Sequence, residues 1–357
     1  MKKTLSLLLS MIFALSSLLL LSSCDDGQTL SKNGSKVEVK SYYTLEYFDT
    51  YCSFKDYSGS SEERNAELVA LVEGEIELCH KLFDIYNDYG GINNLKTVND
   101  SRGGAPVPVD GRIIELIKIS KEMHSVTEGN TNIAMGAVTR LWHDCREEAK
   151  EPGVVARIPD WEDLLEASTH TNINDVVIDE VAGTVTILDP ALTLDVGAIA
   201  KGYAAERVAK LLESEGVKAY LLDFGGNIRV GEKLDGSGFS AGIENPVPYS
   251  PDAYARTLEI KNCALVTSAS TKRSYTVEIN GQTESFHHII NKDTLMPENK
   301  YLSVTVQHSS SAIADALTTG FFNMDETDIR RAVSNLAGVE VTLVYHNSDV
   351  VVINGAE

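Results

Sequence analysis

Two short segments carry the side chains with the clearest capacity for chemistry. They are Asp195–Gly202 (DVGAIAKG) and Ser311–Gly320 (SAIADALTTG). If the second segment is helical, Asp315 and Thr319 are four residues apart and share one face. A carboxylate and a hydroxyl at that spacing can both reach one hard cation, and Mg²⁺ prefers such oxygen ligands. Spacing alone favours a plainer alternative, in which Asp315 caps a helix or pairs with a basic residue and the threonines bond to their own helix.

The first segment is an apolar, strand-like run that ends in an acid and small residues before a helix begins. Asp195 can cap this helix, an interaction worth about 1 kcal/mol. Lys201 carries an ammonium group whose positive charge suits a nearby phosphate.

Between these segments, Leu222–Ile228 (LDFGGNI) predicts a strand, a sharp turn and a second strand. Gly225 and Gly226 are the residues that a turn with positive φ needs, or that close approach of a ligand needs. Taken by itself, this pattern indicates no more than a hairpin.

Together these segments resemble the FAD:protein FMN transferases, the ApbE family of flavin-transferring lipoproteins. The resemblance runs from about Thr44 to about Thr342 and includes the Gly-Gly-Asn turn. It implies a Mg²⁺ site made of the Asp315 carboxylate, the Thr319 hydroxyl and the backbone carbonyl of Ala198. Some family members have a second acid at the position of Thr318.

The resemblance also implies which residues contact FAD. Tyr86 matches a residue that contacts the flavin ring, and aromatic stacking is a physical reason for a tyrosine there. The alternative is a core tyrosine after a helix. Asn132 stands where the family usually has an acid. The implied contacts are Phe48, Tyr86, Asn130, Thr131, Asn132, Asp195, Lys201 and Ile290.

A pair of histidines, His287 and His288, precedes Ile290. The resemblance implies that His288 is the base that takes the proton from the accepting hydroxyl, and an ordinary pKa near 6.5 suits that work. His287 is the competitor, because neighbouring side chains in a strand point to opposite faces. The sequence has Asn291-Lys292 where the family has Asp-Pro, which removes the acid that could orient His288.

The beginning of the chain predicts export. Lys2 and Lys3 precede an uncharged apolar run from Leu5 to Leu21, which is shorter than the roughly 20 residues of a spanning helix and fits a signal sequence. We expect a lipoprotein signal over 1–23 with lipidation of Cys24; an ordinary secretory signal is the alternative. The polar stretch 24–36 is typical of a flexible tether, and 37–357 form the catalytic domain. The resemblance implies a lipid-anchored protein on the extracytoplasmic side of the cell membrane.

The amino-acid composition limits the classes of molecule that the protein can bind. The chain has 31 basic and 52 acidic residues and a formal net charge of −21, which argues against a nucleic-acid-binding surface. An anionic dinucleotide therefore needs local help from helix N-termini, backbone N–H groups and a divalent metal. The cysteines other than Cys24 are not spaced like metal ligands, and their sequence positions are compatible with either free thiols or disulfides. They are Cys52, Cys79, Cys145 and Cys263.

The pattern of elements predicts an α+β fold with largely antiparallel sheets flanked by helices. Helices are expected over 60–83, with Ser60 and Glu63 as a capping box, and over 110–127, 133–148, 160–168, 198–215, 312–323 and 326–336. Strands are expected over one or two stretches of 37–54, and over 176–179, 184–188, 219–224, 227–232, 239–243, 256–260, 274–279, 286–290, 302–307, 339–345 and 350–353.

The function that the resemblance implies is Mg²⁺-dependent transfer of FMN from FAD to a Thr or Ser hydroxyl, with release of AMP. The acceptors would be extracytoplasmic electron-transfer flavoproteins. Two alternatives stay open: a pyrophosphatase that splits FAD into FMN and AMP, and a non-catalytic FAD-binding lipoprotein. The presence of both Asp315 and Thr319 disfavours the last.

Overall fold

The structure, a computed structural model, describes residues 28–30, 34 and 36–356. The predicted signal sequence, Cys24 and most of the predicted tether lie outside the described residues. Within the described part, none of the helices has the length and apolar character needed to cross a membrane.

An eight-stranded sheet forms the centre of the fold, and every neighbouring pair in it is antiparallel. This confirms the predicted α+β class. From one edge to the other the strands are β17 (Val350–Asn354), β16 (Glu340–Val344), β15 (Ser303–His308), β12 (Cys263–Ala269), β9 (Asn227–Val230), β8 (Tyr220–Phe224), β4 (Cys52–Asp56) and β3 (Lys40–Thr44).

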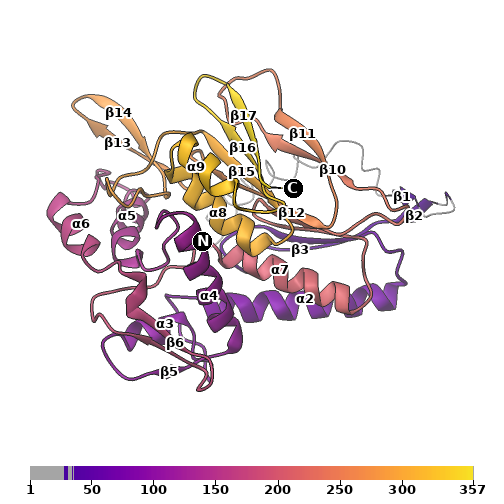
Figure 1. Cartoon of the computed structure of the whole chain (residues 1–357), viewed down its shortest axis with the longest axis horizontal. Helices are drawn as coiled ribbons and strands as arrows, with labels where there is room; N and C mark the ends of the chain where they lie inside the picture. The colour runs from indigo at the N-terminus through magenta and orange to yellow at the C-terminus, as the bar shows by residue number, and fades with distance from the viewer. Residues whose placement is uncertain (1–27, 31–33, 35, 357) are drawn as a thin grey trace.

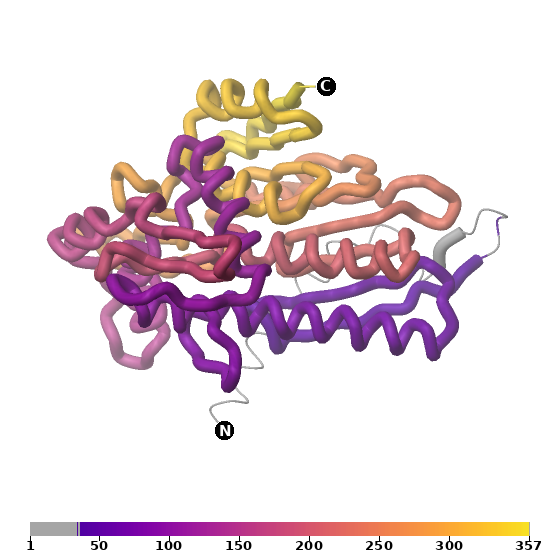
Figure 2. Tube along the Cα trace, turned by 60° about the horizontal axis from the view of Figure 1, so that its bottom comes forward, coloured from indigo at the N-terminus to yellow at the C-terminus, as the bar shows by residue number. Residues whose placement is uncertain are grey.

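Three helices cover one face of this sheet. Helices α7 (Ala200–Ser214) and α8 (Ser311–Asn323) pack on the strands and on each other, and α2 (Glu62–Phe83) packs along α7 (Figures 1 and 2). Helix α2 forms because apolar residues recur every three to four positions, and these residues are buried against the sheet and α7: Leu68, Val72, Ile76, Cys79 and Phe83.

Strand residues alternate between two apolar layers, as the pleat of a strand requires. Leu222 on β8 belongs to the core under the helices, whereas its neighbour Leu221 faces a second cluster on the opposite side of the sheet. That second cluster is closed by a hairpin of β10 (Phe239–Glu244) and β11 (Tyr254–Ile260).

The smaller elements surround one end of the sheet (Figure 1). They comprise four helices, α3 (Leu95–Asp100), α4 (Gly111–Val126), α5 (Gly136–Glu148) and α6 (Trp161–Ser168), and the short sheet β5 (Val107–Pro108), β7 (Thr184–Ile187) and β6 (Val176–Asp179). The others are the single turn η1 (Ile173–Asp175), the hairpin β13 (Tyr275–Ile279) and β14 (Gln282–Phe286), and helix α9 (Glu326–Val333). The pair β1 (Gln28–Leu30) and β2 (Lys36–Glu38) lies apart from these elements, at the right of Figure 1.

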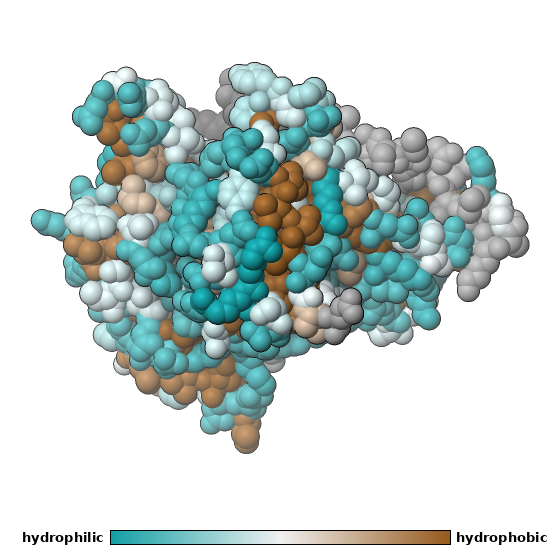
Figure 3. All heavy atoms as spheres, turned by 45° about the horizontal axis from the view of Figure 1, so that its top comes forward, coloured by the Kyte–Doolittle hydropathy of each residue, from teal (hydrophilic) through white to brown (hydrophobic). Residues whose placement is uncertain are grey.

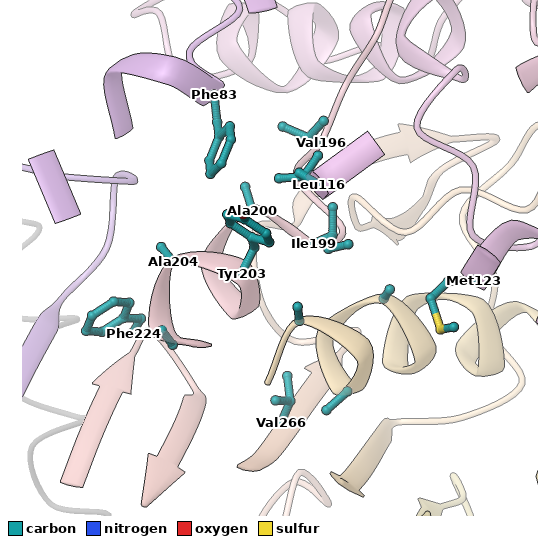
Figure 4. Packing of buried hydrophobic residues seen from close by; sticks show 14 of the residues in the cluster. Phe83, Leu116, Met123, Val196, Ile199, Ala200, Tyr203, Ala204, Phe224 and Val266 are labelled. Atoms are coloured by element: carbon teal, nitrogen blue, oxygen red, sulfur yellow. The ribbon is translucent and has the colours of Figure 1, made fainter. Parts of the chain in front are cut away.

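The main core lies where α2, α7 and α8 meet. Phe83 at the end of α2 and Tyr203 on α7 pack edge to face with ring centroids 5.5 Å apart, and Val266 of β12 lies beneath the helices (Figure 4). All four cysteines in the described part of the chain are buried free thiols. In Figure 3, polar residues dominate the visible face and a narrow hydrophobic band crosses it, as expected of an acidic chain.

Three sequence-based predictions about the elements are wrong in detail. Ser61, not Ser60, caps α2, because its side chain accepts a hydrogen bond from Arg64 N; the Ser60 hydroxyl donates to Asp56 instead. The strand expected over 286–290 is absent, because β14 ends at Phe286 and only Ile290 forms an isolated bridge. The helix expected from Ile133 begins at Gly136.

Candidate active site

The two segments that were far apart in the sequence meet at Asp315. This residue lies on α8 and is 4% exposed. The backbone N–H of Gly202 on α7 donates to Asp315 Oδ2 at 2.8 Å, and Lys201 Nζ lies 3.7 Å from the same oxygen. Burial raises the pKa of Asp315, and the Lys201 charge and the Gly202 N–H oppose that rise. The Asp315 carboxyl is therefore held by two residues in the first turn of α7, Lys201 and Gly202.

Helix α7 approaches α8 so closely at Gly202 that no side chain fits there. A Cβ atom on Gly202 would lie 2.4 Å from the carbonyl oxygen of Ser311 and 2.5 Å from the Asp315 Cβ. A second contact holds the same pair of helices, because Ser311 N donates to Glu206 Oε2 at 2.9 Å. Glu206 is itself buried and paired with Arg229 at 3.4 Å.

The hydrogen bond from Gly202 to Asp315 also changes the backbone hydrogen bonding at the start of α7. In a regular helix the Gly202 N–H would bond to the carbonyl of Ala198. Here it donates to Asp315, and no described residue donates a hydrogen bond to the Ala198 carbonyl. This carbonyl oxygen is therefore available as a ligand, as the metal prediction requires.

The two threonines of α8 behave differently. The Thr318 hydroxyl donates to the carbonyl of Asp315 at 2.7 Å and accepts from Ser268 Oγ at 2.9 Å, so it bonds to its own helix as the plainer alternative expected. Among the described residues, the Thr319 hydroxyl has no hydrogen-bond partner. Of the two threonines, Thr319 is therefore the one whose hydroxyl has no partner among the described residues.

A hard cation fits this donor set. The three predicted oxygen donors are the Asp315 carboxylate, the Thr319 hydroxyl and the Ala198 carbonyl, which suit Mg²⁺ better than softer metals. Within the residues that the structure describes, no cluster of three or more His, Cys, Asp or Glu side chains is arranged to hold a metal. A cation here would thus rely on one carboxylate and on neutral oxygens.

Asp195 does not cap α7, contrary to the alternative drawn from the sequence. The residue at the helix start is Ile199. Asp195 Oδ1 accepts from Gly197 N at 2.9 Å and Oδ2 accepts from the Thr139 hydroxyl at 2.8 Å. These bonds fix the turn that leads into α7 and attach it to α5.

Tyr86 lies beside Asp195, after the end of α2. Its ring is 47% exposed, so it is not the core tyrosine that the alternative proposed. Burial raises the pKa of Tyr86 and the charge of Asp195 adds to the rise. His143 stacks on the ring at 5.6 Å and 28°, and the Arg140 guanidinium lies 5.4 Å from the ring centre. The contacts of Arg140 and His143 with the Tyr86 ring were not predicted, although two residues spaced i, i+3 on a helix share one face.

Phe48 and Ile290 are held by packing. Phe48 has a positive φ of 57°, and its N–H donates to His80 Nδ1 at 3.3 Å. Ile290 is 6% exposed within the apolar cluster around Trp142 and Phe286. Little of the Ile290 side chain is therefore accessible.

The stretch from Asn130 to Asn132 is tied to its surroundings through all three side chains. Thr131 Oγ1 donates to the Ala316 carbonyl of α8 at 2.6 Å. Asn130 donates to the Thr127 carbonyl and Asn132 to the Thr171 carbonyl. The stretch thus lies against the middle of α8. A shallow hollow of about 320 Å³ beside Asn132 is lined by none of the other predicted site residues; its lining is His124, Glu128, Gly129, Asn132, Met135, Ser168, Thr171, Lys292, Asp293 and Leu295.

The two histidines have distinct environments. His287 is 4% exposed, its Nε2 lies 2.7 Å from the Glu298 carbonyl, and its Nδ1 accepts from Ile289 N at 3.2 Å. Both of its ring nitrogens are therefore in use. His288 has an exposed side chain and no hydrogen-bond partner among the described residues.

Positive charges gather near His288. Although His288 is exposed at the surface, the chain packed around its ring desolvates the charged form and lowers the pKa of His288, and the charges of Arg273, Lys201 and Arg146 add to the effect. The imidazole is therefore neutral at neutral pH, the form that can accept a proton. The charge of Lys201 acts on both residues: it lowers the pKa of His288 and pairs with the Asp315 carboxyl.

Comparison with known proteins identifies the class to which this fold and site belong. The ApbE family matches residues 41–343, and the chain belongs to that family. A relative from Klebsiella pneumoniae (strain 342), named FAD:protein FMN transferase, is 27% identical over 80% of this chain and 87% of its own. Another of that name, from Vibrio cholerae serotype O1, is 27% identical over 95% of this chain and 94% of its own.

Solved structures share the fold. The ApbE protein of Thermotoga maritima superposes with a TM-score of 0.75 and 22% identity, covering 88% of this chain and 97% of that one. The flavin transferase ApbE from Vibrio cholerae gives a TM-score of 0.71 and 22% identity, with 89% and 98% covered.

Gly202→Ala tests the contact between α7 and α8. We expect the free energy of unfolding to fall by about 1–3 kcal/mol because the new methyl group overlaps Ser311 and Asp315. Gly74→Ala on α2 is the matched control, because its Cβ would meet open space; an exposed helical glycine replaced by alanine gains about 0.5–1 kcal/mol. Urea unfolding of both variants measures the difference, and equal stability of the two would contradict this packing.

Proposed function

We propose that this protein is an FAD:protein FMN transferase that uses Mg²⁺ and releases AMP. The observation that carries the proposal is the Gly202–Asp315 contact: the Asp315 carboxylate lies beside Lys201, and the Ala198 carbonyl is left without a hydrogen-bond donor among the described residues. A divalent cation would offset the negative charge that the Asp315 carboxylate and an anionic dinucleotide bring together. The names of the relatives supply the substrate class.

Asp315, Thr319 and the Ala198 carbonyl would hold the metal. Bound Mg²⁺ supplies charge neutralisation and polarises the phosphoryl oxygens of the pyrophosphate. Lys201 adds a positive charge at the same place, because its ammonium lies near the Asp315 carboxyl. Its length and flexibility suit contact with a phosphate as a point charge.

The flavin end would lie against Tyr86, with Asp195 and the stretch 130–132 on neighbouring elements. The exposed part of the Tyr86 ring provides a flat surface for the isoalloxazine. Phe48 would add apolar contact. Of the predicted ring contacts, Ile290 contributes through the small exposed part of its side chain or its backbone.

The reaction is a substitution at the phosphorus of the FMN half of FAD. The oxygen of a Thr or Ser hydroxyl on the acceptor protein forms the new P–O bond. The bond between that phosphorus and the bridging oxygen breaks, and the bridging oxygen leaves with AMP. His288 takes the hydroxyl proton, which its neutral imidazole can accept. In phosphoryl transfer the protein contributes mainly positioning and charge neutralisation.

Asp315 variants test the metal site. Asp315→Ala and Asp315→Asn should lose FMN transfer by about a hundredfold or more, because loss of one electrostatic contact to a transition state commonly costs that much. Asp315→Asn keeps an acceptor for the Gly202 N–H. FAD affinity should stay largely intact in both variants. EDTA should have the same effect on the wild type.

The assay follows covalent flavin fluorescence on an acceptor protein together with free FMN and AMP. Asp328→Ala on α9, a partly exposed carboxylate paired with Arg331, is the control and should behave like the wild type. Near-normal transfer by Asp315→Ala places the metal elsewhere. Release of free FMN without labelled acceptor would identify a pyrophosphatase, and tight FAD without turnover would identify a binding protein.

The pH dependence tests His288. Its pKa is lowered from the ordinary 6.5, so the base stays neutral as the pH falls through 6.5. We expect the acidic limb of kcat/KM to have an apparent pKa below 6.5, because kcat/KM reports the free enzyme. His288→Gln should lose about 10²–10⁴-fold in kcat/KM, with exposed His346→Gln as control. An unchanged rate in His288→Gln would exclude it as the base.

We also propose that the protein is held at the cell membrane by a diacylglyceryl group on Cys24, facing the extracytoplasmic side. The support is the basic start, the short apolar run and the small residues before Cys24. Mass spectrometry of the membrane fraction should find a lipid-modified N-terminal peptide beginning at Cys24. Cys24→Ala should release the protein or block processing, and an unmodified N-terminus elsewhere would contradict the proposal.

A further inference from the structure

The hairpin of β13 and β14 projects from the body of the molecule near α5 (Figure 1). Asn280 and Gly281 join its strands with φ of 53° and 77°, the two positive values of a type I′ turn. Among the described strands, β13 and β14 pair only with each other. Each of them therefore has an outer edge without a neighbouring strand.

One face of this hairpin anchors it and the other is polar. The anchoring side chains pack in the apolar cluster around Trp142, and they are Tyr275, Val277, Ile279 and Phe286. The side chains on the opposite face are exposed, and they are Thr276, Glu278, Thr283 and Ser285. This alternation follows the pleat of the strands. Packing of one face holds the hairpin in place and leaves its edges uncovered.

The register determines which backbone groups lie along the outer edge of β14. Ile279 and Gln282 flank the two-residue turn and form a hydrogen-bonded pair. Because alternate residues of an antiparallel strand direct their N–H and C=O groups away from the partner, Thr283 and Ser285 direct theirs outward. No described residue forms a hydrogen bond with these backbone groups. An exposed row of donors and acceptors therefore lines the edge.

Strand β14 lacks the usual protection of an exposed edge. Proteins commonly interrupt such edges with a bulge, a proline or a lysine. Here the register is continuous across all five residue pairs, and the strand sequence, Gln-Thr-Glu-Ser-Phe, contains neither proline nor lysine. The edge can therefore accept a further strand along its whole length.

This edge leads directly to the proposed base. Strand β14 ends at Phe286, and His288 follows two residues later with an exposed ring that has no hydrogen-bond partner among the described residues. At about 3.3 Å per residue, the chain from Ser285 to His288 spans at most about 10 Å. A segment paired with Thr283 and Ser285 would therefore bring its next few residues to His288.

We propose that the outer edge of β14 is the docking site for the acceptor protein. An extended segment next to the accepting Thr or Ser pairs with the backbone of Thr283 and Ser285, and the hydroxyl lies beyond it at His288. Main-chain hydrogen bonds provide the affinity, as in other proteins that add a strand to an open edge. This inference rests on the proposed function.

A second copy of this chain is a poorer occupant of the same edge. The exposed face of the hairpin is polar, whereas obligate homodimer interfaces are usually more apolar. A partner strand from a second copy would also leave no reason for the edge to continue into His288. The continuity of β14 with the base therefore favours the acceptor protein.

Thr283→Pro tests the edge, because proline removes an outward N–H and is tolerated on an edge strand. The assay uses the full chain saturated with FAD and, as acceptor, a flavin-free electron-transfer protein that takes FMN on a threonine. We expect kcat/KM for the acceptor to fall about tenfold, the order of one lost hydrogen bond. The Kd for FAD should be unchanged, because the edge does not contact the predicted FAD site.

Glu278→Pro is the matched control. Glu278 lies directly opposite Thr283 in the register and directs its N–H to the other edge of the same hairpin. The Thr283 hydroxyl donates to the Glu278 carboxylate, so both variants lose this side-chain contact and only the altered edge differs. Glu278→Pro should transfer FMN like the wild type.

Hydrogen exchange gives a second measurement, which needs no substitution in this protein and decides the matter if Thr283→Pro does not fold. An acceptor whose accepting threonine is replaced by valine binds without reacting. Its addition to the full chain with FAD should slow amide exchange at Thr283 and Ser285. Exchange at Thr276 and Glu278 on β13 should stay the same.

A folded Thr283→Pro variant that transfers FMN normally overturns the inference, and so does equal loss in Glu278→Pro or unchanged exchange at β14. Slower exchange at β14 that appears without acceptor as the protein concentration rises would identify a second copy as the occupant and also overturn it. Failure of the proposed function looks different, because the wild type then labels no acceptor and the inference falls with it. Loss confined to Thr283→Pro, with protection of β14 by the acceptor, supports the docking site.

Discussion

The close approach of α7 to α8 at Gly202 is the contact on which the site depends. It is possible only because residue 202 has no side chain: a Cβ there would lie 2.4 Å from the Ser311 carbonyl oxygen. The approach lets the Gly202 N–H leave its helix partner and bond to Asp315. One bond therefore fixes a carboxylate on α8 and frees the Ala198 carbonyl before α7. A wider separation of the helices would lose both at once.

The site also provides local positive charge in a chain whose net charge is −21. Cations from separate segments gather around it: Lys201 from α7, Arg146 from α5 and Arg273 from the loop before β13 act together on His288. The local field at His288 thus depends on a few nearby charges, and long-range repulsion is screened over roughly 8–10 Å by salt. The formal charge of the whole chain is a poor guide to a single site for this reason.

The sequence predicted most of the fold where periodicity is strong, as for α2 and α4. It failed where strands are short or lack alternation. Strand β12, at the middle of the sheet, is covered on both faces, and its first four residues are all buried; without alternation, no strand was predicted there. For the site, residue identities came from resemblance, whereas the hydrogen bonds that Gly202 and Glu206 make to α8 join distant segments, and no local pattern encodes them.

The paired histidines illustrate how the fold gives two neighbouring residues of the same type different surroundings. A strand would have separated His287 and His288 by its pleat, but the backbone after β14 is irregular. The division arises instead from hydrogen bonding, because backbone groups of Ile289 and Glu298 occupy both nitrogens of His287. That arrangement also fixes the path of the loop that carries His288. The turn after Ile290 closes without an acid, because Asn291 Oδ1 accepts hydrogen bonds from Asp293 N and Thr294 N.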